Sequence, residues 1–366
     1  MNPSVSIVIP FRDAESTLEP CIRSILEQDY SEIEVICIDD GSSDRGSALI
    51  QDMVIEAGRE SQFRILANRG SGLVDALNQG LAECQGDIFL RMDADDVMDP
   101  LRVGRQMEHL KDVDVSCCRV HPFGHVGEGR REYFNWQNGI LSQDQLRSNR
   151  YVECPFQHPT LALSVRSLRK VEGYRHGDFP EDYDLFLRIL ENGLTIEKLS
   201  DTLLHYRCSE NQLSHTDERY SKKAFHNLRR SWIRSDASLP ERWKARPLVV
   251  WGASRTSRRR FEDHFPGLVP DYFVDIKPSL IDRDTGLQGR DPAAESRLPE
   301  SDSGPLNSAP EDSRRRPGIF GPEYLFKDHR KPFVLVYVNA RGARPIIESA
   351  LGEKGFFPDQ DYLCIG

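Results

Sequence analysis

Short apolar runs, each followed by a longer amphipathic stretch, dominate the first half of the chain. In the amphipathic stretches leucine, isoleucine and methionine recur at the spacing of one helix face, as they do from about residue 14 to residue 28. Strands that alternate with covering helices form parallel sheets buried on both faces. The pattern therefore predicts an α/β domain with a mostly parallel sheet flanked by helices. The predicted strands are Val5–Phe11, Glu34–Asp39, Phe63–Asn68 and Asp87–Arg91.

Acidic residues gather where the fourth predicted strand ends. Asp93, Asp95 and Asp96 fall within four positions directly after the apolar run, and Arg91 points to the same face as Asp93 by strand alternation. Carboxylates this close repel one another unless a cation lies among them, and oxygen ligands suit hard divalent ions. Ligands of open α/β sheets also bind at the carboxyl ends of strands. The sequence predicts a metal and ligand site here, and the alternative is a solvated acidic turn.

The second and third predicted strands also end in polar turns. Asp39 and Asp40 end the second strand, and Ser42 or Ser43 is expected to cap the helix that follows. The third strand runs into a glycine-rich turn before the next helix. Helix capping by Asp40 is an alternative to ligand binding, and both roles can hold at once.

Two later stretches carry candidate acid and base groups. Glu181 and Asp182 stand at the start of a predicted helix, where carboxylates complement the helix dipole. His205 and Arg207 end an apolar strand. An imidazole there can form a hydrogen bond at the strand edge. His158 lies in a loop before another predicted strand, where it can have a structural role.

After a basic helix the chain starts a second series of strands. Pro247–Ser254 predicts a strand and a glycine turn, Tyr272–Asp275 a second strand and Phe333–Asn339 a third, in a Rossmann-like order. The turn at Gly252 lacks the second and third glycines of the dinucleotide fingerprint, so a structural or oligomerising role is expected rather than a bound dinucleotide. Residues from about 282 to 317 are rich in Pro, Ser, Gly and charge, which predicts a disordered insertion.

Composition limits the class of protein. A chain of 366 residues is long enough for two domains, and the pattern divides it into residues 1–215, a helical linker over 216–245 and a smaller α/β domain over 246–366. The net charge of -10 argues against nucleic acid as a partner. No apolar run is long enough to cross a membrane, and the chain enters a strand almost at once. Neither a membrane span nor a signal peptide is therefore expected.

The cysteines and one basic helix bear on location. The eight cysteines show no metal-binding spacing and are interpreted as reduced thiols, which favours a cytoplasmic protein. The helix expected over about 217–234 carries several lysines and arginines. Its basic face is either solvated or lies on the anionic inner face of a membrane.

Six motifs follow one another along the first 215 residues. They are Val5–Phe11, Ile38–Asp44, Asn68–Gly70, Ala76–Gly80, Arg91–Asp96 and Glu181–Arg188. Together they resemble the family 2 glycosyltransferases of the GT-A fold, and their order makes the resemblance specific where each motif alone is weak. It covers roughly residues 4 to 215 and implies inverting transfer of a sugar from a nucleotide-sugar donor to a glycan or lipid-linked acceptor. The resemblance favours a uridine diphosphate sugar as donor, and Mn²⁺ or Mg²⁺ as cofactor.

The resemblance also implies a role for each candidate residue. Asp95 would hold the cation, with His205 as a further ligand, and Asp93 would contact the sugar or ribose of the donor. Asp182 would be the general base, and His158 and Glu181 would lie on the acceptor side. The donor-binding residues that it implies are Pro10, Asp39, Asp40, Asn68, Gly72, Arg91, Asp93 and Arg207.

Three other functions compete with this interpretation. Asp93–Val97 fits the nucleophile motif of haloacid dehalogenase-like phosphatases, in which the residue at Asp93 attacks phosphorus, but that family carries the motif on its first strand. A sugar-nucleotide pyrophosphorylase opens with a glycine-rich basic loop, and Pro10–Ala14 contains no glycine. A protein that binds sugar nucleotides without catalysis stays open. Metal-dependent donor hydrolysis would separate it from an enzyme.

Overall fold

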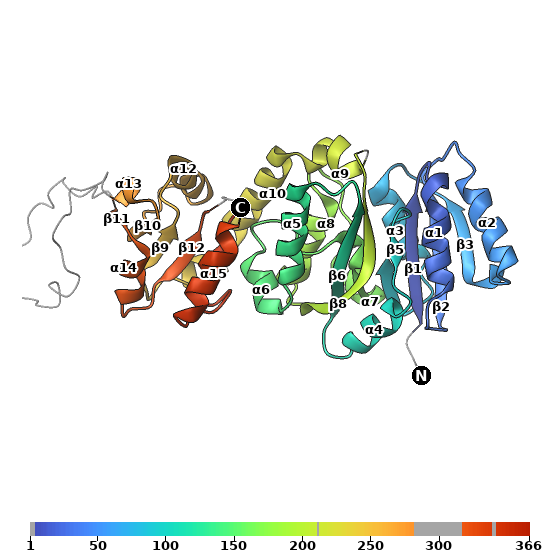
Figure 1. The fold of residues 1–366 in the computed structure, drawn as a ribbon, viewed down its shortest axis with the longest axis horizontal. Helices are drawn as coiled ribbons and strands as arrows, with labels where there is room; N and C mark the ends of the chain where they lie inside the picture. Colours follow the sequence, from blue (N-terminus) through green and yellow to red (C-terminus); the bar gives the residue numbers. More distant parts are fainter. Residues whose placement is uncertain (1–3, 211, 282–316, 339–341) are drawn as a thin grey trace, which may run out of the picture. The chain divides into compact units, whose positions relative to one another are not determined.

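The computed structural model describes residues 4–210, 212–281, 317–338 and 342–366 (Figure 1). The chain divides into two compact units, residues 1–232 and 233–366, and the division falls inside helix α10 (Lys222–Ser235). The predicted helical linker contains this point. Each unit is built around its own sheet, and every candidate site residue belongs to the first unit.

The first unit contains an eight-stranded sheet. Its strands are β1 (Val5–Phe11), β2 (Ile33–Asp39), β3 (Phe63–Ala67), β4 (Ile88–Arg91), β5 (Val97–Met98), β6 (Val115–Gly124), β7 (Ala162–Ser164) and β8 (Ile196–Cys208). The order across the sheet is β3-β2-β1-β4-β7-β6-β8-β5. β7 runs antiparallel to β4 and β6, and β5 runs antiparallel to β8. The other strands share one direction, so the sheet is mostly parallel, as predicted.

Helices cover this sheet because their apolar stripes match its two faces. The helices and turns of the first unit are α1 (Glu15–Leu26), α2 (Gly46–Glu56), η1 (Glu60–Gln62), α3 (Leu73–Glu83), α4 (Arg102–His109), α5 (Glu128–Gly139), α6 (Gln143–Ser148), η2 (His158–Thr160), α7 (Val165–Lys170), α8 (Glu181–Glu191), α9 (Leu213–Thr216) and η3 (Glu218–Tyr220). On β1, Ile7 and Ile9 share one core cluster with Leu18 and Ile22 of α1. The intervening Val8 points to the other face, as the period of two requires.

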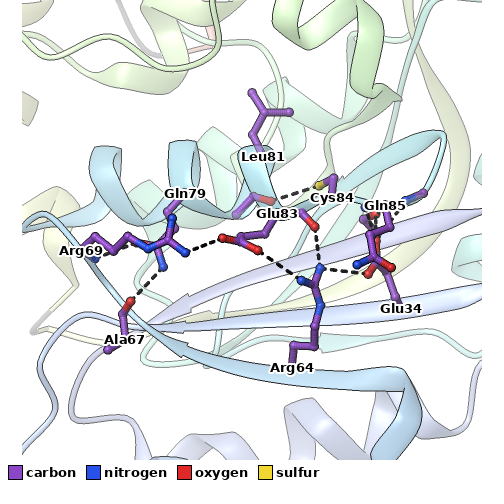
Figure 2. Close-up of polar contacts among 12 residues, drawn as sticks. Glu34, Arg64, Ala67, Arg69, Gln79, Leu81, Glu83, Cys84 and Gln85 are labelled. Atoms are coloured by element: carbon purple, nitrogen blue, oxygen red, sulfur yellow. Dashed lines mark hydrogen bonds and ion pairs between the residues drawn. The ribbon is translucent and has the colours of Figure 1, made fainter.

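Charged side chains tie α3 to the edge of the sheet (Figure 2). The guanidinium of Arg64 on β3 donates to Glu34 Oε2 at 3.1 Å and to Glu83 Oε2 at 3.2 Å. Arg69 donates to the second carboxylate oxygen of Glu83 at 2.7 Å, and its amide donates to Gln79 Oε1 at 2.7 Å. These contacts fix the turn between β3 and α3, which carries two of the predicted donor-binding residues.

The second unit contains a five-stranded parallel sheet in the order β11-β10-β9-β12-β13. Its elements are α11 (Ser238–Glu241), β9 (Leu248–Trp251), α12 (Arg255–His264), β10 (Tyr272–Val274), α13 (Pro278–Ile281), β11 (Ile319–Phe320), α14 (Pro322–Lys327), β12 (Phe333–Val336), α15 (Ala343–Glu353) and β13 (Tyr362–Cys364). The strands proceed outward from β9 in both directions, which is the order of Rossmann-like sheets. The function of this unit stays a prediction.

The prediction that Ser42 or Ser43 caps the helix after β2 is wrong. Helix α2 begins at Gly46, with Arg45 before it, and no side chain at that position caps it. The amide of Gly46 donates instead to Asp44 Oδ1 at 3.0 Å. The physical reason is that both serines are engaged with aspartates of the loop, as the site below shows.

Other elements differ in extent from the prediction. β5, β6, β11 and β13 were not anticipated, and β8, whose end was predicted, extends from Ile196 to Cys208. The basic helix begins at Lys222, after the short α9 and η3. Residues 282–316 of the predicted insertion, and Asn339 at the end of a predicted strand, lie outside the described residues.

The eight cysteines are free, and only Cys84 is not buried. This agrees with their interpretation as reduced thiols. Within the described ranges, the helices are too short or too polar to cross a bilayer.

Candidate active site

The candidate residues lie along one edge of the first sheet. β1, β2, β3, β4, β6 and β8 share a direction, so their carboxyl ends meet at this edge. Because polar turns follow several of these strands, side chains far apart in sequence come together there.

Hydrogen bonds join the loop after β1 to the loop after β2. Ser43 donates its amide and its hydroxyl to Asp13 Oδ1, at 2.7 and 2.9 Å. The amide of Asp13 donates to Ser42 Oγ at 3.0 Å. Asp13 has a φ of 48°, in the left-handed region that aspartate tolerates better than most residues. Pro10, just before this loop, is buried on β1 opposite Ile38 of β2.

Asp39 is held from two sides. Its Oδ1 accepts a hydrogen bond from the amide of Ser42 at 2.8 Å, and its Oδ2 accepts one from Ser47 Oγ at 2.6 Å. Partial burial alone would raise the pKa of this carboxyl, but the hydrogen bonds outweigh burial and hold the pKa below its ordinary value. Asp39 is therefore an oriented, ionised group at the site edge.

The structure brings Asp40, Asn68 and Gly72 together. Asp40 Oδ1 accepts hydrogen bonds from Asn68 Nδ2 and from the amide of Gly72, both at 2.8 Å. Gly72 precedes α3 and has a φ of 83°, which a side chain would strain. Asp40 thus accepts a hydrogen bond from an amide at the start of α3. The capping alternative had placed it at the start of α2 instead. These three predicted donor-binding residues form one polar wall.

Three carboxylates form a compact cluster after β4. One oxygen from each of Asp93, Asp95 and Asp96 lies within 4.8 Å of the others. Burial, and then the charge of Asp93, raises the pKa of Asp95 to about 6. Burial and both neighbouring acids raise the pKa of Asp96 well above its ordinary value. The cluster thus crowds three carboxyl groups together, with Asp96 buried and Asp93 and Asp95 partly buried.

Two basic residues border this cluster. Arg91 is buried, and its Nη1 lies 2.5 Å from Asp93 Oδ1. Burial alone would lower the pKa of Arg91, but Asp93 and then Tyr174 and Glu181 hold it above its ordinary value. Arg207 donates its amide to Asp96 Oδ1 at 2.7 Å and its Nε to the carbonyl oxygen of Asp95 at 2.8 Å. Arg207 therefore fixes the acidic loop against β8.

Asp96 and His205, both candidate cation ligands, differ in burial and in position relative to the acid cluster. Asp96 Oδ2 is buried without a hydrogen-bond partner among the residues that the structure describes. His205 is exposed, pairs with Val97 across the sheet and has its ring centroid 5.7 Å from that of His121. In the described part of the chain, the compact acid cluster does not include His205. Its role as a ligand stays a prediction.

The predicted base stands at the first turn of α8. Asp182 keeps part of its side chain accessible, whereas Glu181 before it is 1% exposed. Burial, and then the charge of Glu181, raises the pKa of Asp182 to about 8. A carboxylate with such a pKa can accept a proton near neutral pH.

His158 belongs to the packing behind the base. Its Nε2 lies 3.0 Å from Tyr174 Oη, and its Nδ1 lies 3.7 Å from Glu181 Oε1. Burial, and then the charge of Arg91, lowers the pKa of His158 well below its ordinary value, so the ring is neutral. His158 is 7% exposed, which fits a structural role better than contact with a substrate.

Sequence reasoning missed Tyr174, which contacts His158, and Tyr220, which contacts Glu181. Tyr220 Oη lies 2.8 and 2.7 Å from the two carboxylate oxygens of Glu181. Neither tyrosine belongs to a periodic pattern or to one of the six motifs. No local signal marks them, because their contacts arise only from the tertiary fold.

Comparisons with known proteins bear on the first unit. Residues 6–171 match the family described as "Glycosyl transferase family 2". The O-antigen biosynthesis glycosyltransferase WbnJ of Escherichia coli is 29% identical over 233 residues, which cover 62% of this chain and 87% of that protein. The amylovoran biosynthesis glycosyltransferase AmsE of Erwinia amylovora is 26% identical over 245 residues, 64% of this chain and 83% of that protein.

A further relative has a more specific name. The UDP-Gal:alpha-D-GlcNAc-diphosphoundecaprenol beta-1,3-galactosyltransferase of Escherichia coli is 29% identical over 218 residues, which cover 57% of this chain and 74% of that protein.

Solved structures share the fold. A structure of S. aureus TarS in complex with UDP-GlcNAc is similar with a TM-score of 0.50 and 17% identity, over 63% of this chain and 67% of that chain. Another TarS structure gives a TM-score of 0.52 and 16% identity, over 66% of this chain and 42% of that chain. Residues 6–171 are thus similar in sequence to family 2 glycosyltransferases, and the likeness to the TarS structures shows a shared fold.

Proposed function

We propose that this chain is an inverting, metal-dependent glycosyltransferase that moves a sugar from a uridine diphosphate donor to a hydroxyl group of a glycan or lipid-linked acceptor. One observation carries the proposal: the same domain holds a carboxylate cluster suited to a cation and a separate carboxylate, Asp182, suited to accept a proton. Relatives named for O-antigen and amylovoran biosynthesis, and one named for transfer from UDP-Gal, support the donor and acceptor classes.

The polar wall of Asp40, Asn68 and Gly72 suits the nucleoside part of the donor. Its carboxylate and amide groups are held in place by one another, so they can accept or donate further hydrogen bonds in a fixed geometry. Asp39, ionised and oriented beside them, would contact the base or the ribose.

The acid cluster fits a hard divalent ion, Mn²⁺ or Mg²⁺. It offers only carboxylate oxygens, and the buried, unpartnered Asp96 Oδ2 is the kind of atom that a cation would satisfy, among the residues described. Asp95 and Asp96 would hold the ion, with Asp93 beside them and His205 as a predicted additional ligand. A bound cation would supply electrostatic stabilisation of the diphosphate as its negative charge grows.

The reaction needs one base and no covalent intermediate. The acceptor oxygen forms a bond to the anomeric carbon of the donor sugar while the bond from that carbon to the diphosphate breaks. The electron pair of the broken bond leaves with the nucleoside diphosphate, and the proton of the acceptor hydroxyl passes to a carboxylate oxygen of Asp182. A half-buried carboxylate with a pKa of about 8 supports catalysis over binding of sugar nucleotides alone.

Asp182→Asn tests the assignment of the base. The amide keeps the shape of the side chain but cannot accept the proton, so transfer should fall on the order of 100-fold or more while donor affinity is kept. Transfer from uridine diphosphate sugars with Mn²⁺ measures the first effect, and calorimetry with UDP and Mn²⁺ measures the second.

Asp178→Asn is a matched control. Asp178 is an exposed acid in the loop before the same helix, so its variant should transfer sugar at the wild-type rate. Activity of Asp182→Asn within a few-fold of the wild type would show that another group is the base. Failure of every nucleotide sugar to act as a donor would contradict glycosyl transfer itself.

A further inference from the structure

Glu181 lies in a closed polar pocket behind the predicted base. Its side chain is 1% exposed, and both of its carboxylate oxygens lie within hydrogen-bonding distance of Tyr220 Oη, at 2.8 and 2.7 Å. His158 Nδ1 lies 3.7 Å from Oε1 on another side. A substrate hydroxyl has no open face of this carboxylate to approach, so contact with the acceptor does not explain why a glutamate stands here.

The start of α8 does not explain Glu181 either. A carboxylate that only complemented the helix dipole would gain stability from being ionised, and its pKa would fall. Burial instead raises the pKa of Glu181, although the hydrogen bond from Tyr220 partly opposes this effect. Keeping a carboxylate in this pocket therefore has a cost, which suggests a function.

The neighbour of Glu181 in the chain is Asp182. Two carboxylates on successive residues, both withdrawn from water, interact strongly because little solvent screens their charges. After burial itself, the charge of Glu181 is the largest cause of the raised pKa of Asp182. Besides Tyr220 and His158, the titratable groups that face this pair are Arg91, Tyr133, Glu153, Cys154, Tyr174 and Arg219.

Among these groups, Arg91 opposes the effect of Glu181 and Glu153 adds to it. Arg91 is already in contact with Asp93 at 2.5 Å, so its positive charge is shared between the acid cluster and the carboxylate pair. Glu153 belongs to a different segment and ranks after Glu181 among the influences on Asp182. Glu181 is thus the group whose charge acts most directly on the base.

We propose that Glu181 is a positioning residue: its buried negative charge, held in place by the hydroxyl of Tyr220, makes Asp182 a stronger base toward the acceptor hydroxyl. The inference rests on the proposed function, in which Asp182 takes the proton. Glu181 itself touches neither donor nor acceptor.

Glu181→Gln tests the inference, because glutamine keeps the shape and can still accept a hydrogen bond from Tyr220. The titration of Asp182 is followed by NMR of carboxyl carbons in protein labelled at aspartate, and its signal is assigned by its loss in Asp182→Asn. The midpoint of the Asp182 titration should fall by about one pH unit or more in Glu181→Gln. The acidic limb of the pH profile of transfer should move to lower pH by the same amount.

Tyr183→Phe is the matched control. Tyr183 is buried on the same helix and donates to the carbonyl oxygen of Arg150 at 2.6 Å, so its variant loses a buried hydrogen bond but no charge. It should lose stability without moving the pH profile. If Glu181→Gln does not fold, Tyr220→Phe replaces it, since Glu181 without its donor takes up a proton more readily and loses the charge that acts on Asp182.

The outcomes separate this inference from the proposed function. An unchanged Asp182 midpoint in Glu181→Gln overturns the inference and leaves the assignment of the base intact. A lower midpoint with an unmoved pH profile of transfer supports the action of Glu181 on Asp182 but rules out Asp182 as the base. A shift of both by the same amount supports both proposals.

Discussion

Arg91 forms an ion pair with Asp93. Replacing Arg91 with methionine would remove the positive charge of that pair. Methionine fills most of the same space, so the main change is that the carboxylate loses its partner. The Arg91 side chain is 2% exposed, and the side chain of Asp93 is 28% exposed. Breaking a buried ion pair by removing one partner costs about 3–5 kcal/mol. Because water can still reach Asp93, we expect the lower end, about 3 kcal/mol of unfolding free energy.

The loss should be reversible in part by a cation. Without Arg91, the acid cluster is more negative and should bind Mn²⁺ more tightly, and an ion that binds only the folded state adds to its stability. Urea denaturation of Arg91→Met should therefore show a larger gain from Mn²⁺ than the same measurement on the wild type.

Arg102→Met provides the matched control. Arg102 is also fully buried, but it donates to the carbonyl oxygens of Arg91 and Pro159, at 3.0 and 2.5 Å, and to Gln106 at 3.0 Å, rather than to a carboxylate. Its variant should lose stability too, with a smaller response to Mn²⁺. Equal responses of the two variants, or a loss below about 1 kcal/mol in Arg91→Met, would refute the reasoning about the acid cluster.

Two further predictions concern the base and the polar wall. The pKa of Asp182 in the folded protein is raised from its ordinary value to about 8, so its carboxyl group is protonated below that pH. The rate of transfer should therefore rise about tenfold per pH unit up to a midpoint near 8. A rate that is flat between pH 6 and 8 would contradict this. Gly72→Ala should weaken UDP binding in calorimetry and lose about 1–2 kcal/mol of stability, because φ is 83° at Gly72. Gly58, beyond the end of α2, has a φ of 63°, so Gly58→Ala should lose similar stability with unchanged UDP affinity. Equal losses of UDP affinity in the two variants would argue against a role of the polar wall in donor binding.

Local patterns were enough for the parts of the fold with strong periodicity. The predicted strand Val5–Phe11 has the bounds of β1, because a short, mostly apolar run rich in Val and Ile between polar turns favours a buried strand. β6 was missed because its second half, from Arg119 to Gly124, leaves the apolar pattern and is fixed by pairing with β8. β11 has only two residues, Ile319 and Phe320, too few for any periodic signal.

The contacts of the candidate site also divide into those that local patterns predict and those that arise only from the tertiary fold. The joining of Asp40 to Asn68 could be expected, since both follow parallel strands that end at one edge. The contact of Glu181 with Tyr220 could not, because it joins residues from separate segments after the chain has folded. The place of His205 in β8 was anticipated, but its exposure follows from the tertiary fold.

The hydrogen bonds between the loops after β1 and β2 have a consequence for the thermodynamics of donor binding. Fixing the backbone of one residue costs about 1–2 kcal/mol of conformational entropy. With Asp13 and Ser43 already joined by two hydrogen bonds, these loops are ordered before a ligand arrives. Binding of the nucleoside should therefore carry only a small entropic penalty from this side of the site. Its association rate should also show no slow phase from rearrangement of these two loops, and should depend on diffusion and orientation instead.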